Sequence, residues 1–394
     1  MPLSAPVIVL GLALALFLYA YLGYPLVLWV LSRVRNRPLP GPDEVEEWPT
    51  LSISVPAYNE AAQIRELIHS LLALDYPRDR VQILVVSDCS DDGTDEIVRE
   101  YADQGVELLR MPERGGKNRA ENHAAQFLTG EIVVNTDASI RIHKGALKPL
   151  VAVFTDPEIG CASGRDISVG AGEYTENAGE SGYVGYEMGI RDLETRVSGI
   201  IGASGCFYAI RPHLHRLPLP ESLSRDFSAA LHSEEHGYRA VSVPRATCLV
   251  PRSPSLHKEY RRKVRTITRG LQTLWYKRFL LNPFRHGWFA WMLFSHKICR
   301  WLLPWAGIAA FLALGVLAFR SPLAAAAFAA GWVVLGMAAV GWVLAGRDAA
   351  PRLFSVPAFL VAGNLAAAHA LLRALRGGQD KLWEPTRRHV VKAS

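Results

Sequence analysis

The chain has 394 residues, half of them hydrophobic, and its 43 Lys and Arg exceed its 37 Asp and Glu to give a formal charge of +6. This modest basic excess is typical of cytoplasmic loops beside anionic lipid rather than of nucleic-acid binding, because no long basic run is interleaved with aromatic residues. The five cysteines lack the spacing of zinc ligands or of a redox pair. We therefore expect membrane lipids as a partner and no nucleic acid.

The N-terminal stretch Val7–Leu31 is apolar and uncharged. It is longer than the about 20 residues that a helix needs to cross the hydrocarbon of a bilayer. Arg33, Arg35 and Arg37 follow it directly, and the positive-inside rule places such a basic flank in the cytoplasm. Residues 1–37 are thus predicted to be a transmembrane helix with a basic flank, and the residues after them to be cytoplasmic.

The C-terminal part of the chain carries a second group of apolar segments. Within residues 302–376 we expect three spans, the third of them weaker: Leu302–Phe319, Leu323–Ala345 and Phe354–Leu372. Residues 282–301 mix aromatic and basic side chains, which is typical of an amphipathic helix in the membrane interface. One span before the cytoplasmic domain and three after it would leave the basic tail, residues 377–394, outside, against the charge rule. A re-entrant third segment is the alternative, and the sequence does not decide between them.

Residues 48–281 lie between these apolar regions and show strands alternating with helical patterns. Such alternation predicts an α/β domain with a parallel sheet and helices on both faces. Four strands are expected, at Leu51–Pro56, Val81–Val86, Val106–Met111 and Glu131–Asn135. Ligands of such sheets bind at the carboxyl ends of the strands. Those ends here carry polar and acidic side chains, so a binding site is expected there: Asn59, Glu60, Asp88, Asp91, Asp92 and Asp137.

These residue types suit a nucleotide sugar. Carboxylates such as Glu60 and Asp88 accept hydrogen bonds from a base and a ribose, and Asp137 would hold Mg²⁺ or Mn²⁺ against the diphosphate. Lys117, at a helix start after two glycines, would add a cation beside the phosphates or is a solvated surface lysine. Asp91 and Asp92 precede a helix, so capping of that helix is as good an interpretation as ligand binding.

Transfer of a sugar to a hydroxyl also needs a general base. Asp226, at the start of an amphipathic stretch that follows Ser224 and Arg225, is the candidate. As a sequence feature alone it is equally consistent with a helix N-cap.

Six motifs occur in order between Leu51 and about Gly270: VPAYNE from Val55, SDCSDDGT from Ser87, GGKNRAEN from Gly115, NTDAS from Asn135, GASGCFYAIR from Gly202, and SRDF with HGYRAVSVP from Ser224 to Pro244. Together they resemble the membrane-bound family 2 glycosyltransferases with a GT-A fold, a group that includes cellulose, hyaluronan and chitin-oligosaccharide synthases. The resemblance implies a Rossmann-like, mostly parallel sheet in a cytosolic domain with N- and C-terminal transmembrane helices.

The resemblance also implies a function: a hexosyltransferase that moves a sugar with inversion from a nucleotide diphosphate-sugar, expected to be a UDP-sugar, to a polysaccharide or lipid-linked acceptor. It further implies a multi-pass protein of the inner (plasma) membrane and a polysaccharide-export partner. Asp226 would be the base, and Asp137, with Ser139 as a weak second ligand, would bind the metal. Two further sets follow from the motifs. The nucleotide sugar would contact Pro56, Tyr58, Glu60, Asp88, Lys117, Asp137, Arg262 and Arg265, and the acceptor would contact Gly202, Ser204, Gly205 and Cys206.

Three positions depart from the pattern of this family. Ser139 stands where the metal motif usually has a second Asp, and Arg225 stands where an acid usually precedes the base. The run from Arg262 to Thr266 lacks the Trp of the processive synthases, so cellulose-like processivity is not expected. A basic face on anionic lipid is the alternative role for Arg262 and Arg265.

Two other functions remain compatible with the sequence. One is a membrane nucleotidyltransferase, although no complete phosphate-binding P-loop pattern is found. The other is a non-catalytic subunit that binds a nucleotide sugar within a polysaccharide synthesis or secretion complex, for which the missing metal Asp and the missing Trp argue. A transporter is a poor match, because the few spans carry no paired intramembrane charges.

Overall fold

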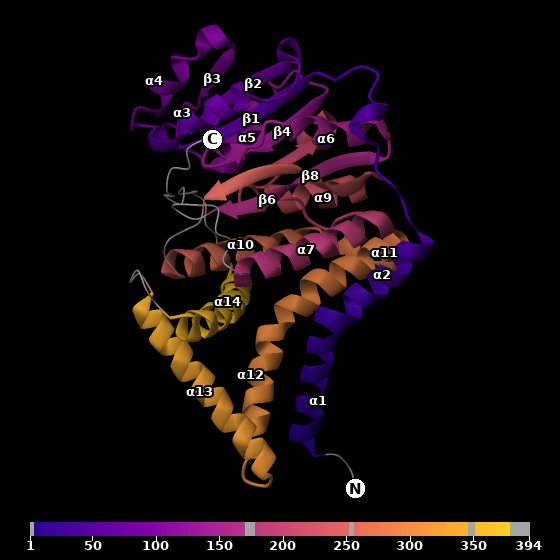
Figure 1. Cartoon of the computed structure of the whole chain (residues 1–394), viewed down its shortest axis with the longest axis vertical. Coiled ribbons are helices and arrows are strands. Elements are labelled where there is room, and N and C mark those ends of the chain that lie inside the picture. The colour runs from indigo at the N-terminus through magenta and orange to yellow at the C-terminus, as the bar shows by residue number, and fades with distance from the viewer. Residues whose placement is uncertain (1–3, 170–177, 252–255, 346–350, 379–394) are drawn as a thin grey trace. The chain divides into compact units, whose positions relative to one another are not determined.

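The computed structural model describes residues 4–169, 178–251, 256–345 and 351–378. The chain divides into two compact units. The helical unit comprises Met1–Leu31, Ser253–Gln272 and Ala290–Gly378, and the sheet unit comprises Ser32–Arg252, Thr273–Phe289 and Gln379–Ser394. Figure 1 shows the strands of the sheet unit and the long helices of the helical unit. The predicted basic tail beyond Gly378, including its Trp383–Arg388 motif, lies outside the described residues.

The sheet unit is built on one eight-stranded sheet with the order β3-β2-β1-β4-β7-β6-β8-β5. Its strands are β1 (Leu51–Ala57), β2 (Val81–Ser87), β3 (Val106–Arg110), β4 (Ile132–Thr136), β5 (Arg141–Ile142), β6 (Ile159–Val169), β7 (Phe207–Ile210) and β8 (Arg239–Pro251). The four predicted strands are confirmed as β1 to β4, and they pair in parallel. The sheet is nevertheless mixed, because β7 runs antiparallel between β4 and β6, and β5 runs antiparallel to β8.

Helices cover both faces of this sheet, as predicted. Among the described residues, the α-helices that lie wholly in this unit are α3 (Ala61–Leu72), α4 (Thr94–Arg99), α5 (Lys117–Ala124), α6 (Leu147–Ala152), α7 (Ala178–Val197), α8 (Pro212–His215) and α9 (Arg225–Glu235). Short 3-10 turns occur at Pro42–Glu44, Arg78–Arg80, Ala102–Gln104, Val153–Thr155 and Arg278–Leu281. Buried side chains of α3, α4 and α6 form one core with Ile53 and Val55, and those of α5, α8 and α9 form the other with Leu84 and Val86.

The alternation of side chains along β1 and β2 explains this two-sided burial. Successive residues of a strand point to opposite faces, so a strand covered on both faces is mainly apolar along its whole length. Every residue of β1 is buried, and its carboxyl end runs into the loop that begins at Tyr58. The parallel register of β1 with β2 and β4 brings the ends of these three strands to one edge of the sheet.

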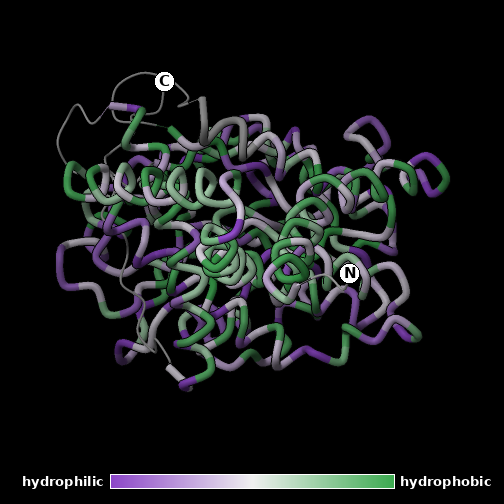
Figure 2. The backbone as a smooth tube through the Cα atoms, turned by 90° about the horizontal axis from the view of Figure 1, so that it is seen from below, coloured by the Kyte–Doolittle hydropathy of each residue, from purple (hydrophilic) through white to green (hydrophobic). Residues whose placement is uncertain are grey.

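The helical unit contains long apolar helices, and the hydrophobic coils beside the N label are green in Figure 2. Its helices are α1 (Ala5–Leu18), α2 (Tyr24–Val34), α10 (Leu256–Tyr276), α11 (Pro283–Leu293), α12 (Arg300–Leu317), α13 (Pro322–Leu344) and α14 (Arg352–Leu375), of which α2, α10 and α11 continue into the sheet unit. π-helical turns at Tyr19–Gly23 and Phe294–Cys299 join α1 to α2 and α11 to α12. The Tyr19 hydroxyl connects the two π turns through a hydrogen bond with Ser295 (2.7 Å), and it accepts a second one from Trp291 Nε1 of α11 (3.0 Å).

Four helical runs among the described residues are long and apolar enough to cross a membrane: Ala5–Val34, Pro283–Leu317, Pro322–Leu344 and Arg352–Leu375. They coincide with the four predicted spans to within two residues where the predicted spans extend past them, and the second run also takes in most of the segment 282–301. That segment is helical from Pro283, with a kink at Gly287 where φ is +49°. Its predicted place in the membrane interface stays a prediction.

Candidate active site

Asp88, directly after β2, holds the glycine turn that precedes α5. Its two carboxylate oxygens accept hydrogen bonds from the backbone N–H groups of Gly115 and Gly116, each at 2.8 Å. Gly116 has a φ of +83°, a conformation that disfavours any other residue. Asp88 is also buried. Through these two hydrogen bonds it fixes the backbone turn that directly precedes Lys117. Its predicted contact with a nucleoside stays a prediction.

The loop after β1 is tied to the loop after β2. Asn59 adopts a φ of +53° and exchanges two hydrogen bonds with Asp91, at 2.7 and 3.0 Å. Asp92 accepts hydrogen bonds from the first N–H of α3, at Ala61 (3.0 Å), and from the first N–H of α4, at Thr94 (3.1 Å). The capping interpretation is therefore confirmed for Asp92, which serves two helices at once.

The candidate nucleotide residues of the β1 motif lie at the same edge of the sheet. Pro56 is buried within β1, and Glu60 is buried at the start of α3, where its N–H donates to Thr94 Oγ1 at 2.9 Å. The guanidinium of Arg114 stacks over the ring of Tyr58, 3.9 Å from its centroid. A planar cation on an aromatic face is also a surface on which a flat heterocycle can stack.

Lys117, the first residue of α5, forms an ion pair with Asp137 at the end of β4. The distance from Nζ to Oδ1 is 2.5 Å, and each side chain is about one-fifth exposed, at 20% and 18%. Burial lowers the pKa of Lys117, but the carboxylates of Asp137 and Glu121 outweigh it, so the net shift is upward and the amine stays protonated. The surface-lysine alternative is thus wrong, because Lys117 is held inside an acidic site.

Asp226 lies in the first turn of α9, and Ser224 rather than Asp226 is the N-cap residue of that helix. The N-cap alternative for Asp226 is therefore wrong. The Ser224 hydroxyl donates to Asp226 Oδ1 at 2.6 Å. A Cβ built on Gly205 would lie 3.2 Å from Asp226 Oδ2, so this oxygen faces the backbone of the 202–206 loop.

The residue that replaces the usual acid before the base has a defined partner. Arg225 is 8% exposed and its Nε lies 3.1 Å from the carboxylate of Glu121, which is 1% exposed. The guanidinium also donates to Asn122. Burial raises the pKa of Glu121, and the charges of Lys117 and Arg225 oppose this shift. Arg225 thus compensates the charge of Glu121, a buried acid of α5, and does not face the same way as Asp226, whose Oδ2 lies beside Gly205.

These residues converge on one place. Lys117 interacts electrostatically with Glu121 of its own helix, with Asp137 at the end of β4 and with Asp226 of α9, so acids from three elements act on one ammonium group. Asp88 joins them through the glycine turn that leads into Lys117. The main chain of Cys206 accepts a hydrogen bond from the N–H of Asp137 at 3.3 Å, which adds the 202–206 loop to the cluster.

Arg262 and Arg265 belong to a different part of the molecule. Both lie on α10 in the portion grouped with the helical unit, where Val264 packs with Ala366 and Ala370 of α14. Arg262 forms hydrogen bonds of 2.7 and 2.9 Å with Glu259, one turn before it. Their predicted grip on a diphosphate stays a prediction, as does the lipid-facing alternative.

The residues at Asp137 fit a divalent cation that is held mainly by its substrate. Among the described residues, no group of three or more His, Cys, Asp or Glu side chains is placed to bind a metal. Mg²⁺ is commonly bound through one or two carboxylates together with substrate phosphates, and Asp137 offers one such carboxylate. Ser139 is buried two residues further on, and its role as a ligand stays a prediction.

The candidate site also contains three residues that the sequence patterns did not reveal: Glu121, Asp166 and Arg114. Glu121 lies inside a helix and Asp166 inside a strand, where isolated acids are ordinarily taken for solvent-facing residues. Asp166 accepts a hydrogen bond from Ser204 Oγ at 2.6 Å. Burial raises its pKa, and the Ser204 hydroxyl offsets part of that shift. Its place beside the 202–206 loop is visible only in the fold.

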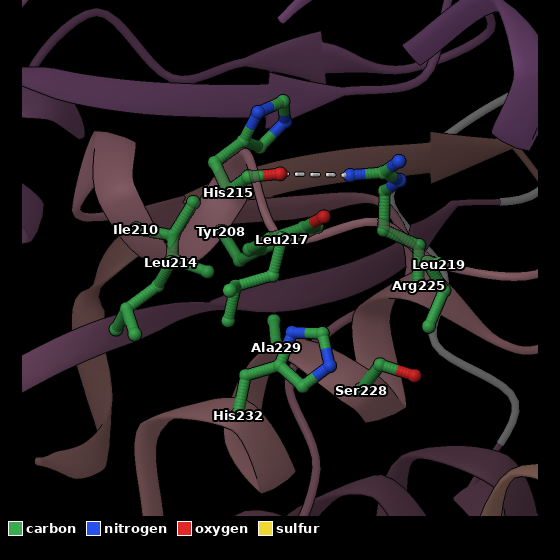
Figure 3. A pocket seen from close by; sticks show the side chains of 10 residues that line it. All are labelled: Tyr208, Ile210, Leu214, His215, Leu217, Leu219, Arg225, Ser228, Ala229 and His232. Carbon is green, nitrogen blue, oxygen red and sulfur yellow. Dashed lines mark hydrogen bonds between the residues drawn. The ribbon is translucent and has the colours of Figure 1, made fainter. Parts of the chain in front are cut away.

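A small cavity lies on the α9 side of the sheet, and its lining differs in composition from the acidic cluster (Figure 3). Its volume is about 10 Å³, which is room for about one water molecule and not for a nucleotide sugar. Mostly apolar side chains line it, with His215, Arg225, Ser228 and His232 as its polar members. Burial lowers the pKa of His215 to about 3 and that of His232 to about 4.

Comparison with solved structures identifies the fold. A mannosyltransferase from Pyrobaculum calidifontis, PcManGT, solved with GDP-Man and Mn²⁺, aligns with 94% of this chain and all of its own at a TM-score of 0.72 and 24% identity. The fold is thus the GT-A fold of glycosyltransferases. Residues 52–211, which include Asp88, Lys117, Glu121 and Asp137, match the family model Glycosyl transferase family 2.

Curated relatives resemble shorter parts of the chain. The probable glycosyltransferase YdaM of Bacillus subtilis is 31% identical over 129 residues, which is 31% of each protein. A beta-monoglucosyldiacylglycerol synthase of Synechocystis is 31% identical over 131 residues, 32% of this chain and 27% of that protein. Cellulose synthase 2 of Novacetimonas hansenii is 29% identical over 164 residues, 40% of this chain and 10% of that protein. The matches therefore span about a third or less of these relatives.

Proposed function

We propose that the chain is a membrane-bound glycosyltransferase that moves a sugar, with inversion, from a nucleotide diphosphate-sugar to a hydroxyl of a glycan or lipid-linked acceptor. The observation that carries this proposal is the ion pair of Lys117 with Asp137 (2.5 Å) at the carboxyl edge of the strands that match the family 2 model, with Glu121 and Asp226 acting electrostatically on the same ammonium. A cation flanked by acids suits the handling of a diphosphate beside a general base.

The roles of the residues follow from their contacts. Asp88 fixes the glycine turn, which places Lys117 where its charge would stabilise the departing diphosphate. Tyr58 and Arg114 would provide a stacking surface for the base, and Glu60 follows Tyr58 by two residues. When bound at Asp137, Mg²⁺ or Mn²⁺ would neutralise charge on the diphosphate.

Asp226 would take the proton of the acceptor hydroxyl. Its Oδ1 is already bound by the Ser224 hydroxyl, so Oδ2, which faces Gly205, is the oxygen assigned to the proton. The absence of a side chain at Gly205 leaves space beside that oxygen, which supports the 202–206 loop as the acceptor side. Attack by the activated hydroxyl opposite the leaving diphosphate inverts the anomeric centre, and the proton leaves the hydroxyl for Asp226 as the new bond forms.

The candidate spans support a membrane setting. We infer that Ala5–Val34 and the three C-terminal runs cross the inner membrane, and that the basic flank at Arg33 to Arg37 keeps the sheet unit in the cytoplasm, where nucleotide sugars are made. Labelling of single cysteines placed at residues 36 and 320 from either side of sealed vesicles tests this orientation. Labelling of position 36 from the outside contradicts it.

The function is tested with the full chain in lipid nanodiscs and a panel of radiolabelled UDP- and GDP-sugars. Lipid extracts and oligosaccharides serve as acceptors, sizing of the product separates single addition from polymerisation, and NMR of the anomeric proton reports inversion. Consumption of one donor with formation of a glycoside is the expected result. Binding of UDP or GDP without consumption of any donor would instead favour the non-catalytic subunit, and exchange of pyrophosphate into the donor would favour the nucleotidyltransferase.

A further inference from the structure

The loop from Gly202 to Cys206 is held from several sides at once. The carbonyl of Gly202 accepts a hydrogen bond from Arg191 of α7 at 2.6 Å. The N–H of Ala203 donates to the main-chain oxygen of Asp226 at 3.4 Å, and the N–H of Ser204 donates to Ser163 Oγ of β6 at 2.8 Å. This loop therefore connects α7, β6 and the start of α9.

Ser204 is the centre of this arrangement. Its hydroxyl donates to Asp166 Oδ1 at 2.6 Å, and its oxygen accepts the N–H groups of Cys206 at 3.1 Å and Phe207 at 3.3 Å. One donor and two acceptor sites are the full capacity of a hydroxyl, so the orientation of Ser204 is determined by Asp166. A hydrogen bond to a carboxylate is about twice as strong as one between neutral groups.

Asp166 is itself restrained on β6. Cys248 of β8 donates its thiol to the same Oδ1 at 3.4 Å, so neighbouring strands hold the carboxylate in place. The carboxylate also interacts electrostatically with Arg191, which binds the first carbonyl of the loop. Asp166 thus belongs to a rigid strand, whereas the residues it restrains belong to a connecting loop.

The restrained loop contacts both the candidate base, Asp226, and the candidate metal ligand, Asp137. A Cβ on Gly205 would lie 3.2 Å from Asp226 Oδ2, and the carbonyl of Cys206 accepts the N–H of Asp137. A shift of the loop by a fraction of an ångström would therefore change the space beside the base oxygen.

We propose that Asp166 is a positioning residue for sugar transfer, which acts through Ser204 to set the Gly202–Cys206 loop against Asp226 and so to align the acceptor hydroxyl. This inference rests on the proposed function. It assigns Asp166 to the acceptor side of the site, so its loss changes transfer to the acceptor and leaves binding of the donor nucleotide intact.

The experiment compares Asp166→Ala, Asp166→Asn, Ser204→Ala and the double variant Asp166→Ala/Ser204→Ala in full-length protein in nanodiscs. Misplacement of a reacting group by about 1 Å costs about 100-fold in rate. We expect Asp166→Ala and Ser204→Ala each to lower kcat for transfer by about this factor, and the double variant to lose no more than either single variant. Asp166→Asn keeps an oxygen acceptor at the same place and retains most of the activity.

Two further measurements separate positioning from general damage. The Kd of UDP or GDP, whichever the wild type binds, is expected to stay unchanged in Asp166→Ala, and hydrolysis of the donor by water is expected to fall much less than transfer. Hydrogen–deuterium exchange is expected to be faster at the amides of residues 204–207 only. Glu131→Gln is the matched control, because Glu131 accepts the Thr50 hydroxyl at 3.0 Å at the other end of the strands and is expected to leave all of these quantities unchanged.

Several results would overturn the inference. These are full transfer activity in Asp166→Ala, equal loss of transfer and of nucleotide binding, Asp166→Asn as damaging as Asp166→Ala, or unaltered exchange at residues 204–207. If the wild type transfers no sugar at all, the proposed function fails instead, and the exchange measurement still shows whether Asp166 orders the loop.

Discussion

The ammonium nitrogen of Lys117 lies 2.5 Å from Oδ1 of Asp137, so the carboxylate assigned to the metal already has a cation beside it. The same ammonium interacts with Glu121 and Asp226. A cation built into the chain at this point reduces the repulsion among three acids before any donor arrives. A nucleotide sugar with its metal would then share Asp137 with Lys117 or draw Lys117 onto the diphosphate.

Replacement of Lys117 by Met tests this arrangement. We expect Lys117→Met to weaken binding of UDP or GDP by about 10-fold or more, since a charged hydrogen bond contributes about 1.5–3 kcal/mol. Binding of Mn²⁺ without nucleotide is expected to tighten, because Asp137 loses its competing cation. Titration of Mn²⁺ followed by electron paramagnetic resonance measures this effect without turnover. Weaker Mn²⁺ binding in Lys117→Met would contradict the competition between the two cations.

Asp226→Asn removes the proposed base while the shape of the side chain is preserved. General-base catalysis contributes about 10²- to 10⁴-fold in rate, so we expect kcat to fall by that range. The Kd of the nucleoside diphosphate, measured by calorimetry, is expected to change by less than about twofold, because Asp226 faces the acceptor loop. Asp103→Asn, at an exposed acid distant in the chain, is the control. Full activity of Asp226→Asn removes this residue from the mechanism.

The first four strands were predictable because each is a short, mainly apolar run followed by polar residues, a pattern that parallel strands share. The positions of Asp88 and Asp137 followed from the same reasoning, since parallel strands end at one edge. The antiparallel insertion of β7 next to β4 was not predictable, because its four residues pair with strands that are distant in sequence.

The proposed acceptor side depends on contacts between residues that are distant in sequence, and sequence patterns do not contain them. Asp166 meets Ser204 across 38 positions of sequence, and Arg225 meets Glu121 across 104. The replacement of the usual acid by Arg225 was visible in the sequence, but its reason was not. Only the fold shows that Arg225 lies beside the buried carboxylate of Glu121, whose negative charge it compensates.

The buried pair of Arg225 and Glu121 yields a prediction about stability. Removal of one member of a buried ion pair typically costs about 3–5 kcal/mol, because the other charge stays in a poorly solvated place. We expect Arg225→Met to lower the free energy of unfolding by this amount and the double variant Glu121→Gln/Arg225→Met to recover much of it. Denaturant unfolding in detergent, followed by tryptophan fluorescence, measures both. Equal losses in the single and double variants would sink the idea that charge compensation is the role of Arg225.

The buried histidine His232 predicts how stability depends on pH. Burial, with a smaller contribution from Lys277, lowers the pKa of His232 from 6.5 to about 4. Between these two values the unfolded chain binds the proton more readily than the folded one. The stabilisation that neutral, buried His232 gives to the folded chain is therefore fully present above pH 6.5. It is lost as the pH falls toward 4, which lowers the free energy of unfolding by up to about 3 kcal/mol. The difference in Tm between wild type and His232→Gln is expected to shrink or change sign over that interval. Exposed His143→Gln is the control, and a difference in Tm that stays constant from pH 7.5 to pH 4.5 would show that His232 does not titrate with folding.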